Sequence, residues 1–377
     1  MFLAIRDLRR GIRRFALVGL VVALVASLST VLAGLADGLV RDGTSGLKAL
    51  PLSHLAFQPH AEASFSRSTL DDDALDIWRS AAEGTDVEVT PLGMSFVNAQ
   101  PVSGDGSAAA VVPARDATTI DVALFGVAPG SFLLPDERAR QSVQGQAGLV
   151  LSHELADEGV EVGDRFLVAG SDVELPVLGF TFTGSYGHVP IGYTSLEAWQ
   201  SLQYGSDPRG RFSAIAVSDT EGIDVAAVDL DAGTDTITKT AAFAGSPGYS
   251  AETMTMTLIR GFLLVIAALI IGAFFTVMTI QRTSQIGLLK AMGASTGYVL
   301  RDSLAQITIV VVVATALGAA VGMAITSSMS DAVPIDLTTN ALVTTVLSLV
   351  AASVVGSLVA LRPITSVEPA IALGVHS

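Results

Sequence analysis

The chain has no cysteine among its 377 residues, and only 15% of the residues are charged. The absence of cysteine excludes disulfides, thiolate metal sites and a cysteine nucleophile. The charged fraction is well below the roughly 25% of an ordinary soluble domain. Because 50% of the residues are hydrophobic, this composition indicates a membrane protein that carries a sizeable soluble part.

Catalytic motifs are also missing. The pair Gly-Lys occurs nowhere, so there is no phosphate-binding G-x-x-x-x-G-K-[ST] loop, and there is no G-x-S-x-G nucleophile elbow. The stretch HELAD at His153 begins like a zinc protease motif, but Asp157 stands where the second histidine is needed, and we expect a helix start there. We therefore predict that the chain by itself is not an enzyme and has no catalytic residues.

Acidic residues are concentrated in the middle of the chain. From Asp37 to Glu252 there are 31 Asp and Glu against 11 Lys and Arg, whereas the rest of the chain has more bases than acids. Nucleic-acid binding needs a basic face, so this distribution argues against it. An acidic middle and basic ends suit a chain that is divided by a membrane.

Four apolar stretches are long enough to cross a bilayer, which takes about 20 residues in a helix. We expect spans at 15–38, 254–280, 303–327 and 338–361. A signal peptide is the alternative for the first span, since it follows a basic start, but the apolar run is too long and lacks a clear cleavage site. We therefore predict a retained helix followed by a large domain at 39–253.

Basic residues predict the orientation of the spans. Arginines crowd residues 1–14, bases recur in 281–302, and the tail 362–377 begins with an arginine, whereas the connection 328–337 contains acids and no base. We expect a multi-pass protein of the cell membrane with both termini in the cytoplasm. The domain and the hairpin 328–337 would then lie outside the cell.

Local patterns predict the elements around the spans. Apolar residues and arginines of 1–14 can take opposite faces of a helix, which predicts an interfacial helix in contact with the lipid bilayer. The domain mixes β-rich runs with helices, one capped by Asp71 and another running from the cap Ser195 to Gly205. The predicted fold class is a four-span α-helical membrane protein with a mixed α/β domain between the first and second spans.

The segment QRTSQIGLLKAMGAS, residues 281–295, directly follows the second span. Its pattern predicts a short amphipathic helix that ends at Gly293. From Arg282 onward it resembles R-x-x-E-I-G-x-x-[RK]-A-x-G-A-[ST], the most persistent stretch of the MacB/FtsX-type ABC exporter permeases, with Gln285 in place of the usual Glu. The stretches at 148–170 and 362–374 and the order of the parts are similar to this family as well.

The resemblance implies a homodimer that works with two copies of a separate ATPase subunit, which binds the ATP. It also implies that residues 281–302 contain a coupling helix seated in a cleft of the ATPase; an ordinary cytoplasmic turn is the alternative. The side chains expected to couple the chain to the ATPase are apolar or basic, apart from the glycine that ends the helix. They are Arg282, Ile286, Leu288, Leu289, Lys290, Met292 and Gly293.

Members of this family carry different cargo, including macrolides, peptides, lipoproteins and haem, and some only transmit force. The modest size of the domain and its acidic, cysteine-free composition resemble the HrtB-type haem exporter permeases most. Haem needs an apolar slot and an axial iron donor such as His, Met or Tyr. The candidate haem contacts at the start of the second span are Tyr249, Glu252, Met254, Met256 and Arg260.

Alternatives remain open for several of these residues. Methionines near a span end are otherwise lipid-facing or packing residues, and Arg260 either holds a haem propionate or reaches outward to the headgroups. His54 and His60 are rival iron donors. Small residues of the first span allow close helix approach and predict a seam between the two copies. They are Gly19, Ala23, Ala26, Thr30, Ala33 and Gly34.

We therefore predict the permease subunit of an ABC efflux transporter that takes a hydrophobic ligand, haem, from the membrane and exports it. A drug or peptide exporter of the same fold is one alternative. An FtsX-like transmitter of signal or force that regulates an extracellular hydrolase is another, and a membrane-anchored receptor without an ATPase is a third. Addition of haemin to the purified complex separates export of haem from these alternatives.

Overall fold

The computed structural model describes residues 12–360, apart from 103–118, 135–138, 141–142, 144–146, 206, 208–209, 282, 284–286, 289–291 and 330–332. The chain divides into two compact units. The first, which we call the helical unit, comprises Met1–Leu39 and Glu252–Ser377, and the second, the sheet unit, comprises Val40–Ala251. The predicted interfacial helix at 1–14, apart from its last three residues, and the tail 362–377 lie outside the described residues.

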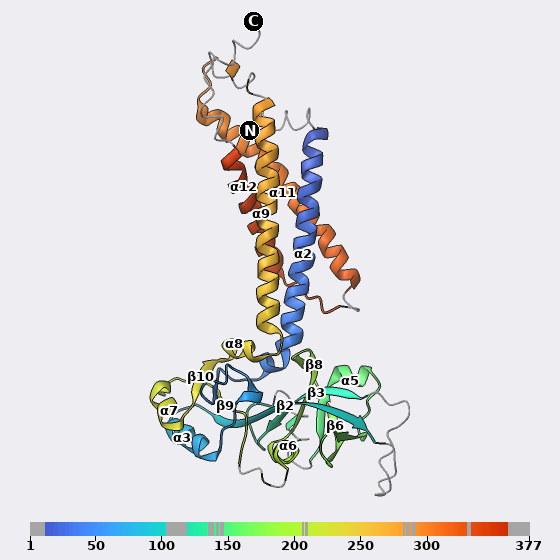
Figure 1. Cartoon of the computed structure of the whole chain (residues 1–377), viewed down its shortest axis with the longest axis vertical. Helices are drawn as coiled ribbons and strands as arrows, with labels where there is room; N and C mark the ends of the chain where they lie inside the picture. The colour runs from blue at the N-terminus through green and yellow to red at the C-terminus, as the bar shows by residue number, and fades with distance from the viewer. Residues whose placement is uncertain are drawn as a thin grey trace. The chain divides into compact units, whose positions relative to one another are not determined.

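Four long helices supply the helical unit: α2 (Ile12–Ala49), α9 (Tyr249–Gln281), α11 (Thr296–Met329) and α12 (Thr339–Ala360). All four are long and apolar enough to cross a membrane, and Figure 1 shows them grouped in one bundle. Three of them extend beyond the predicted spans, because hydropathy marks only the apolar part of a helix. The helix α11 begins at its cap, where the Ser295 hydroxyl accepts a hydrogen bond from the Tyr298 N–H at 3.2 Å.

Glycines bring these helices together in pairs. A Cβ atom on Gly318 of α11 would collide with the carbonyl oxygen of Ala23 in α2. In the same way, a Cβ on Gly356 of α12 would collide with the carbonyl of Ala268 in α9. Close backbone approach of this kind is a main source of helix association in a bilayer, where lipid removes the hydrophobic driving force.

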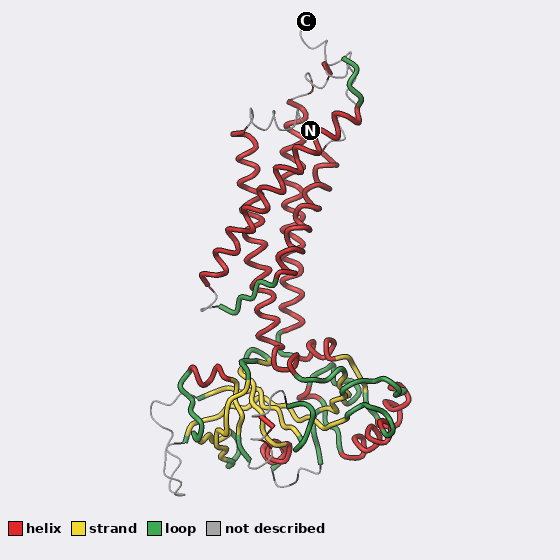
Figure 2. Tube along the Cα trace, turned by 180° about the vertical axis from the view of Figure 1, so that it is seen from behind, coloured by secondary structure: helices red, strands yellow, loops and turns green. Residues whose placement is uncertain are grey.

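The described residues of the sheet unit form one sheet of ten strands. The strands are drawn in yellow in Figure 2. The strand order is β10-β1-β9-β2-β3-β8-β4-β6-β5, and β7 pairs with β8. An additional pairing of β5 with β2 closes six of the strands into a circuit. The strands are β1 (His54–Phe57), β2 (Val89–Pro101), β3 (Ile120–Val127), β4 (Leu149–Ser152), β5 (Arg165–Val168), β6 (Glu174–Thr181), β7 (Ser185–Tyr186), β8 (Val189–Ser195), β9 (Ala214–Val217) and β10 (Asp235–Thr238).

Two hydrophobic cores lie on the two faces of the sheet. Neighbouring residues of β3 alternate between them, so that Phe125 joins the core around Tyr186 while Leu124 joins the core around Trp78 and Trp199. Short helices cover the sheet (Figure 1). They are η1 (Phe65–Arg67), α3 (Asp72–Ala82), α5 (His153–Asp157), α6 (Leu196–Tyr204), α7 (Val225–Ala232), α8 (Lys239–Ala242) and η2 (Phe243–Gly245).

The caps predicted for two helices of the sheet unit are confirmed. The Asp71 side chain accepts a hydrogen bond from the Ala74 N–H at the start of α3, and Ser195 does the same for Ala198 in α6. The helix α6 ends at Gly205, as predicted. The strands β1, β3, β7, β8 and β10 were not predicted, because short runs without a strict alternation carry little signal of their own.

Candidate functional site

Three of the five candidate haem contacts lie on one face of α9. Glu252, Met256 and Arg260 follow one another at intervals of four residues, so they stack along the same side of the helix, and all three are half-buried. Met254 lies on another side and is 66% exposed. The structure therefore brings together Glu252, Met256 and Arg260 and separates Met254 from them.

Arg260 contacts the neighbouring helix of the same unit. Its Nη2 donates a hydrogen bond to the carbonyl oxygen of Ala33 in α2 at 3.1 Å. Its Nε atom is buried and has no hydrogen-bond partner among the described residues. A buried donor without an acceptor is costly in a protein interior, and this one lies on the face that carries Glu252 and Met256.

Tyr249 begins the same helix but belongs to the sheet unit. Its ring lies 6.4 Å from the ring of Phe243, centroid to centroid, in an edge-to-face arrangement. The rival donors lie elsewhere in that unit: His54 is the first residue of β1, where its Nδ1 is 2.8 Å from the Ser53 hydroxyl, and His60 follows in a loop. No cluster of three or more His, Cys, Asp or Glu suited to a metal ion occurs among the described residues.

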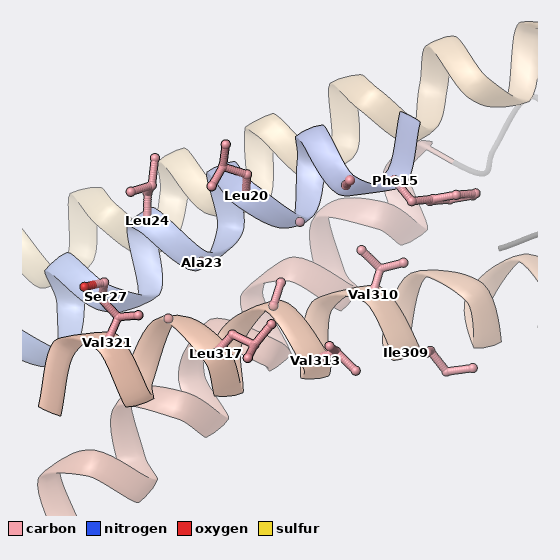
Figure 3. Close-up of a pocket in the computed structure, with 14 residues that line it drawn as sticks. Phe15, Leu20, Ala23, Leu24, Ser27, Ile309, Val310, Val313, Leu317 and Val321 are labelled. Atoms are coloured by element: carbon pink, nitrogen blue, oxygen red, sulfur yellow. The ribbon is translucent and has the colours of Figure 1, made fainter. Parts of the chain in front are cut away.

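A groove of about 720 Å³ runs between α2 and α11 in the helical unit. Figure 3 shows the labelled residues along it, among them Leu20 and Ser27 of α2 and Val310 and Leu317 of α11. Ser27 is the one polar residue in its lining, which contains no His, Met or Tyr. The groove therefore suits a hydrocarbon surface and offers no side chain that would bind iron.

The small residues of the first span are used mostly inside the chain. Ala26, Thr30 and Ala33 are buried. A Cβ on Gly34 would lie 3.1 Å from the Ile335 side chain. The backbone carbonyl of Ala23 lies against Gly318 of α11. The outward side of α2 carries leucines instead, and the predicted seam between two copies stays a prediction. These leucines are Leu17, Leu20, Leu24 and Leu28.

The coupling segment is described in part. Leu288 and Met292 are 51% and 69% exposed, and the Met292 N–H donates to the Leu288 carbonyl at 3.0 Å, as in one turn of a helix. Gly293 has a φ of 99°, a left-handed conformation that favours glycine, and this fits the predicted helix end. The remaining coupling candidates lie outside the described residues. They are Arg282, Ile286, Leu289 and Lys290.

Sequence reasoning missed a polar cluster at the end of α2, within the sheet unit. The Asp42 carboxylate lies 2.8 Å from Nδ1 of His188 and accepts a hydrogen bond from the Ser185 hydroxyl at 3.0 Å. Burial raises the pKa of Glu154, and the nearby carboxylates of Glu158, Asp42 and Asp157 raise it further. Asp42 and His188 are 146 residues apart, so no local pattern links them.

The architecture is that of a multi-span membrane protein with a sheet domain between its first and second long helices. Residues 257–369 match the model of the family described as FtsX-like permease C-terminal. This range begins in α9 and contains the described parts of α11 and α12. The last three long helices are therefore similar to the C-terminal part of FtsX-like permeases.

Comparison with known proteins extends the likeness to the sheet unit. The chain is 25% identical, over an alignment of 381 residues that covers 99% of both chains, to a protein of Staphylococcus haemolyticus named as a hemin transport system permease protein, HrtB. It is 24% identical over 231 residues to HrtB proteins of two Staphylococcus epidermidis strains, covering 60% of this chain and 63% of theirs. Together with the family match, this likeness supports an ABC permease of the HrtB type.

Proposed function

We propose that this chain is the membrane subunit of an ABC efflux transporter that takes haem from the membrane and exports it. A separate ATPase subunit, present in two copies, would bind and hydrolyse the ATP. The observation that carries the proposal is the half-buried face of α9, which combines a carboxylate, a thioether and an arginine in a chain similar to HrtB throughout its length.

The residues of this face have chemistry that suits haem. The Met256 sulfur is a potential axial donor to iron. The Arg260 guanidinium retains a buried N–H without an acceptor in the described part of the chain, and a propionate carboxylate would supply one. Glu252, one turn before Met256, gives this face a carboxylate near the start of the helix. We propose this face as the entry contact for haem.

The energy of ATP hydrolysis would enter the permease just after the C-terminal end of α9. Leu288 and Met292 form an exposed apolar pair one helical turn apart, which is the kind of surface that a cleft in a partner subunit covers. A rigid contact at this point would move α9 and α11 together, since it lies in the segment that joins Gln281 of α9 to Thr296 of α11. The excess of bases in segments 1–14 and 281–302 supports a cytoplasmic location for this turn and an extracellular one for the sheet unit.

Haemin titration of the purified complex tests the proposal. We expect a shift of the Soret band on addition of haemin and an increase in ATPase activity. Met256→Ala and Arg260→Gln should each weaken haemin binding by about tenfold or more, which corresponds to about 1.4 kcal/mol. Met254→Ala is the matched control, because Met254 is exposed on another side of the same helix, and it should bind haemin as the parent does.

Three outcomes would count against the proposal. A complex that shows neither a Soret shift nor increased ATPase activity favours a transmitter of force without cargo. Stimulation of the ATPase by drugs or peptides but not by haemin favours an exporter of another ligand. Equal haemin binding by the parent and by the Met256 and Arg260 variants would remove the α9 face as the contact while leaving haem as cargo.

A further inference from the structure

The two halves of α9 differ in how tightly they pack within the helical unit. The first half, residues 252–266, contains no buried residue, although every position in it is described. The second half, residues 267–281, has buried residues at intervals of four along one face. They are Ala267, Ile271, Phe275 and Thr279. Because a segment with few buried contacts opens at a lower free-energy cost than a packed one, the first half is the part of α9 that the chain holds less firmly.

Close backbone contact with α12 fixes α9 near the start of its second half. A Cβ atom on Gly272 would lie 3.0 Å from the carbonyl oxygen of Gly356. A Cβ on Gly356 would in turn collide with the carbonyl oxygen of Ala268. Backbones this close are packed without a side chain between them. Residues 268–272 therefore form a fixed contact about which the first half of α9 can tilt.

Arg260, in the first half of α9, reaches across to α2. Its Nη2 donates a hydrogen bond to the carbonyl oxygen of Ala33 at 3.1 Å. The Ala33 side chain is fully buried, so the acceptor belongs to a well-packed position of α2. The hydrogen bond therefore joins the loosely packed half of α9 to a firmly held turn of the neighbouring helix.

This turn of α2 is also bound by the connection between α11 and α12. Residues 333–338 of that connection lie against it. The Asp336 N–H donates a hydrogen bond to the Gly34 carbonyl at 3.0 Å. The Thr338 hydroxyl donates a second one to the Asp37 carboxylate at 2.7 Å. These bonds fix α2 to a segment that is independent of α9.

Close approach strengthens the same attachment. A Cβ on Gly38 would collide with the carbonyl oxygen of Pro334. A Cβ on Gly34 would lie 3.4 Å from the Cβ of Leu337. Since α2 is held here by backbone contacts as well as by hydrogen bonds, loss of the Arg260 contact would leave α2 in place. Motion at this end of the helical unit would then fall to α9.

A carboxylate is a competitor for the Arg260 guanidinium. Ala33 lies inside α2, where a backbone carbonyl already accepts the N–H of the residue four positions later. A carboxylate has two free oxygens and can accept two parallel hydrogen bonds from one guanidinium. It would also serve the buried Nε–H of Arg260, which has no partner among the described residues. A ligand carboxylate therefore draws Arg260 away from α2.

We propose that Arg260 and the Ala33 carbonyl form a catch, and that a carboxylate of the ligand releases it. On release, the first half of α9 tilts away from α2 about the contact with α12 at residues 268–272. The connection 333–338 keeps α2 in place. The identity of the ligand rests on the proposed function, in which the carboxylate is a haem propionate, whereas the catch follows from the contacts of the helical unit alone.

Distances between pairs of spin labels in the full complex test the catch, since the chain has no native cysteine to compete for the label. Leu28→Cys with Phe262→Cys joins α2 to the first half of α9. Leu17→Cys with Val277→Cys joins α2 to the second half and is the matched control. All four side chains are exposed. Labelled chains are diluted with unlabelled ones, so that each distance lies within one copy.

Arg260→Met removes the donor that reaches Ala33 and keeps an unbranched side chain. We expect it to shift the distance between labels at 28 and 262 to longer values and to leave the control pair unchanged. Arg260→Lys retains a charged donor and should stay close to the parent. An unchanged distance in Arg260→Met, or an equal shift of both pairs, would overturn the catch whatever the cargo is.

The ligand is tested on the parent, which also covers the case that Arg260→Met does not fold. The probe is gallium protoporphyrin IX, a diamagnetic substitute for haemin that keeps both propionates. It should lengthen the distance between labels at 28 and 262 as Arg260→Met does, and its dimethyl ester should not. An equal response to the ester would overturn release by a carboxylate. A shift in Arg260→Met without any response to the porphyrin would support the catch and count against haem as the cargo.

Discussion

At the scale of single residues, the acidic composition of the chain lowers the stability of the folded state at Glu154. Burial and the carboxylates of Glu158, Asp42 and Asp157 raise the pKa of Glu154 above its ordinary value of 4.5. The folded state therefore binds a proton at this site more readily than the unfolded state does. Above the raised pKa the carboxyl of Glu154 is ionised in both the folded and the unfolded state. The folded state then bears the full free-energy penalty of the charge.

Glu154→Gln should therefore raise the melting temperature of the protein at pH 7.5. The gain should shrink as the pH falls through the raised pKa and vanish below 4.5, because the carboxyl is then protonated in both states. Thermal unfolding of the detergent-purified protein at a series of pH values measures this. Glu221→Gln, at an exposed turn of the same unit, is the control and should show no comparable gain. A lower melting temperature for Glu154→Gln at every pH would contradict the interpretation.

At the scale of elements, the pairing of α2 with α11 depends on a backbone contact. Gly318 lies so close to the Ala23 carbonyl that even a methyl group would force the helices apart. Among the described residues, and apart from its own stretch of helix, no atom lies within 4 Å of the position of a Cβ on Gly261 of α9, so this glycine is not needed for packing. Both glycines lie in long apolar helices, so a substitution at Gly261 is the control for the same substitution at Gly318.

Gly318→Ala should destabilise the protein by roughly 1–3 kcal/mol, the usual cost of overpacking, and should narrow or distort the groove between α2 and α11. Gly261→Ala should be neutral or slightly stabilising, because alanine favours helix more than glycine does. Melting temperatures of the two variants in the same detergent give the comparison. Equal stability of the two variants would show that the α2 and α11 backbones can separate at little cost.

At the scale of the whole molecule, the proposed transport cycle depends on the turn between α9 and α11. Gly293 has a φ of 99°, which a β-branched residue adopts only with strain. Its Cβ position is open, so the effect of a substitution there comes from the backbone and not from a steric collision. A change at this residue therefore alters the turn and leaves the packing of the helical unit intact.

Gly293→Val should abolish the haemin-stimulated ATPase activity of the complex while the permease is still made and inserted. Gly297→Ala is the control, because Gly297 lies within α11 and no described residue outside its own stretch of helix comes within 4 Å of its Cβ position. It should retain stimulation. ATPase assays of the two reconstituted complexes, with and without haemin, make the comparison. Normal stimulation of Gly293→Val would show that this turn does not carry energy into the permease.

Much of the fold was predicted by patterns that lie close together in the sequence. A span is an unbroken apolar run, and a cap such as Ser195 acts within three residues of the amide it binds, so each is visible in a short window. The orientation of the spans and the coupling role of segment 281–302 remain predictions, since they depend on a membrane and a partner subunit. The strand order could not be predicted, because pairing of β1 with β9 and β10 joins segments that are more than 150 residues apart.

The candidate site could likewise be predicted from the sequence only in part. Helical spacing alone places Glu252 and Met256 on one face, and the sequence by itself therefore determined the spans, the caps and this face. Only the tertiary structure decided that Arg260 turns toward Ala33, 227 residues away. The physical reason is that local periodicity fixes which side of an element a residue occupies, whereas contacts between elements depend on how distant backbones pack.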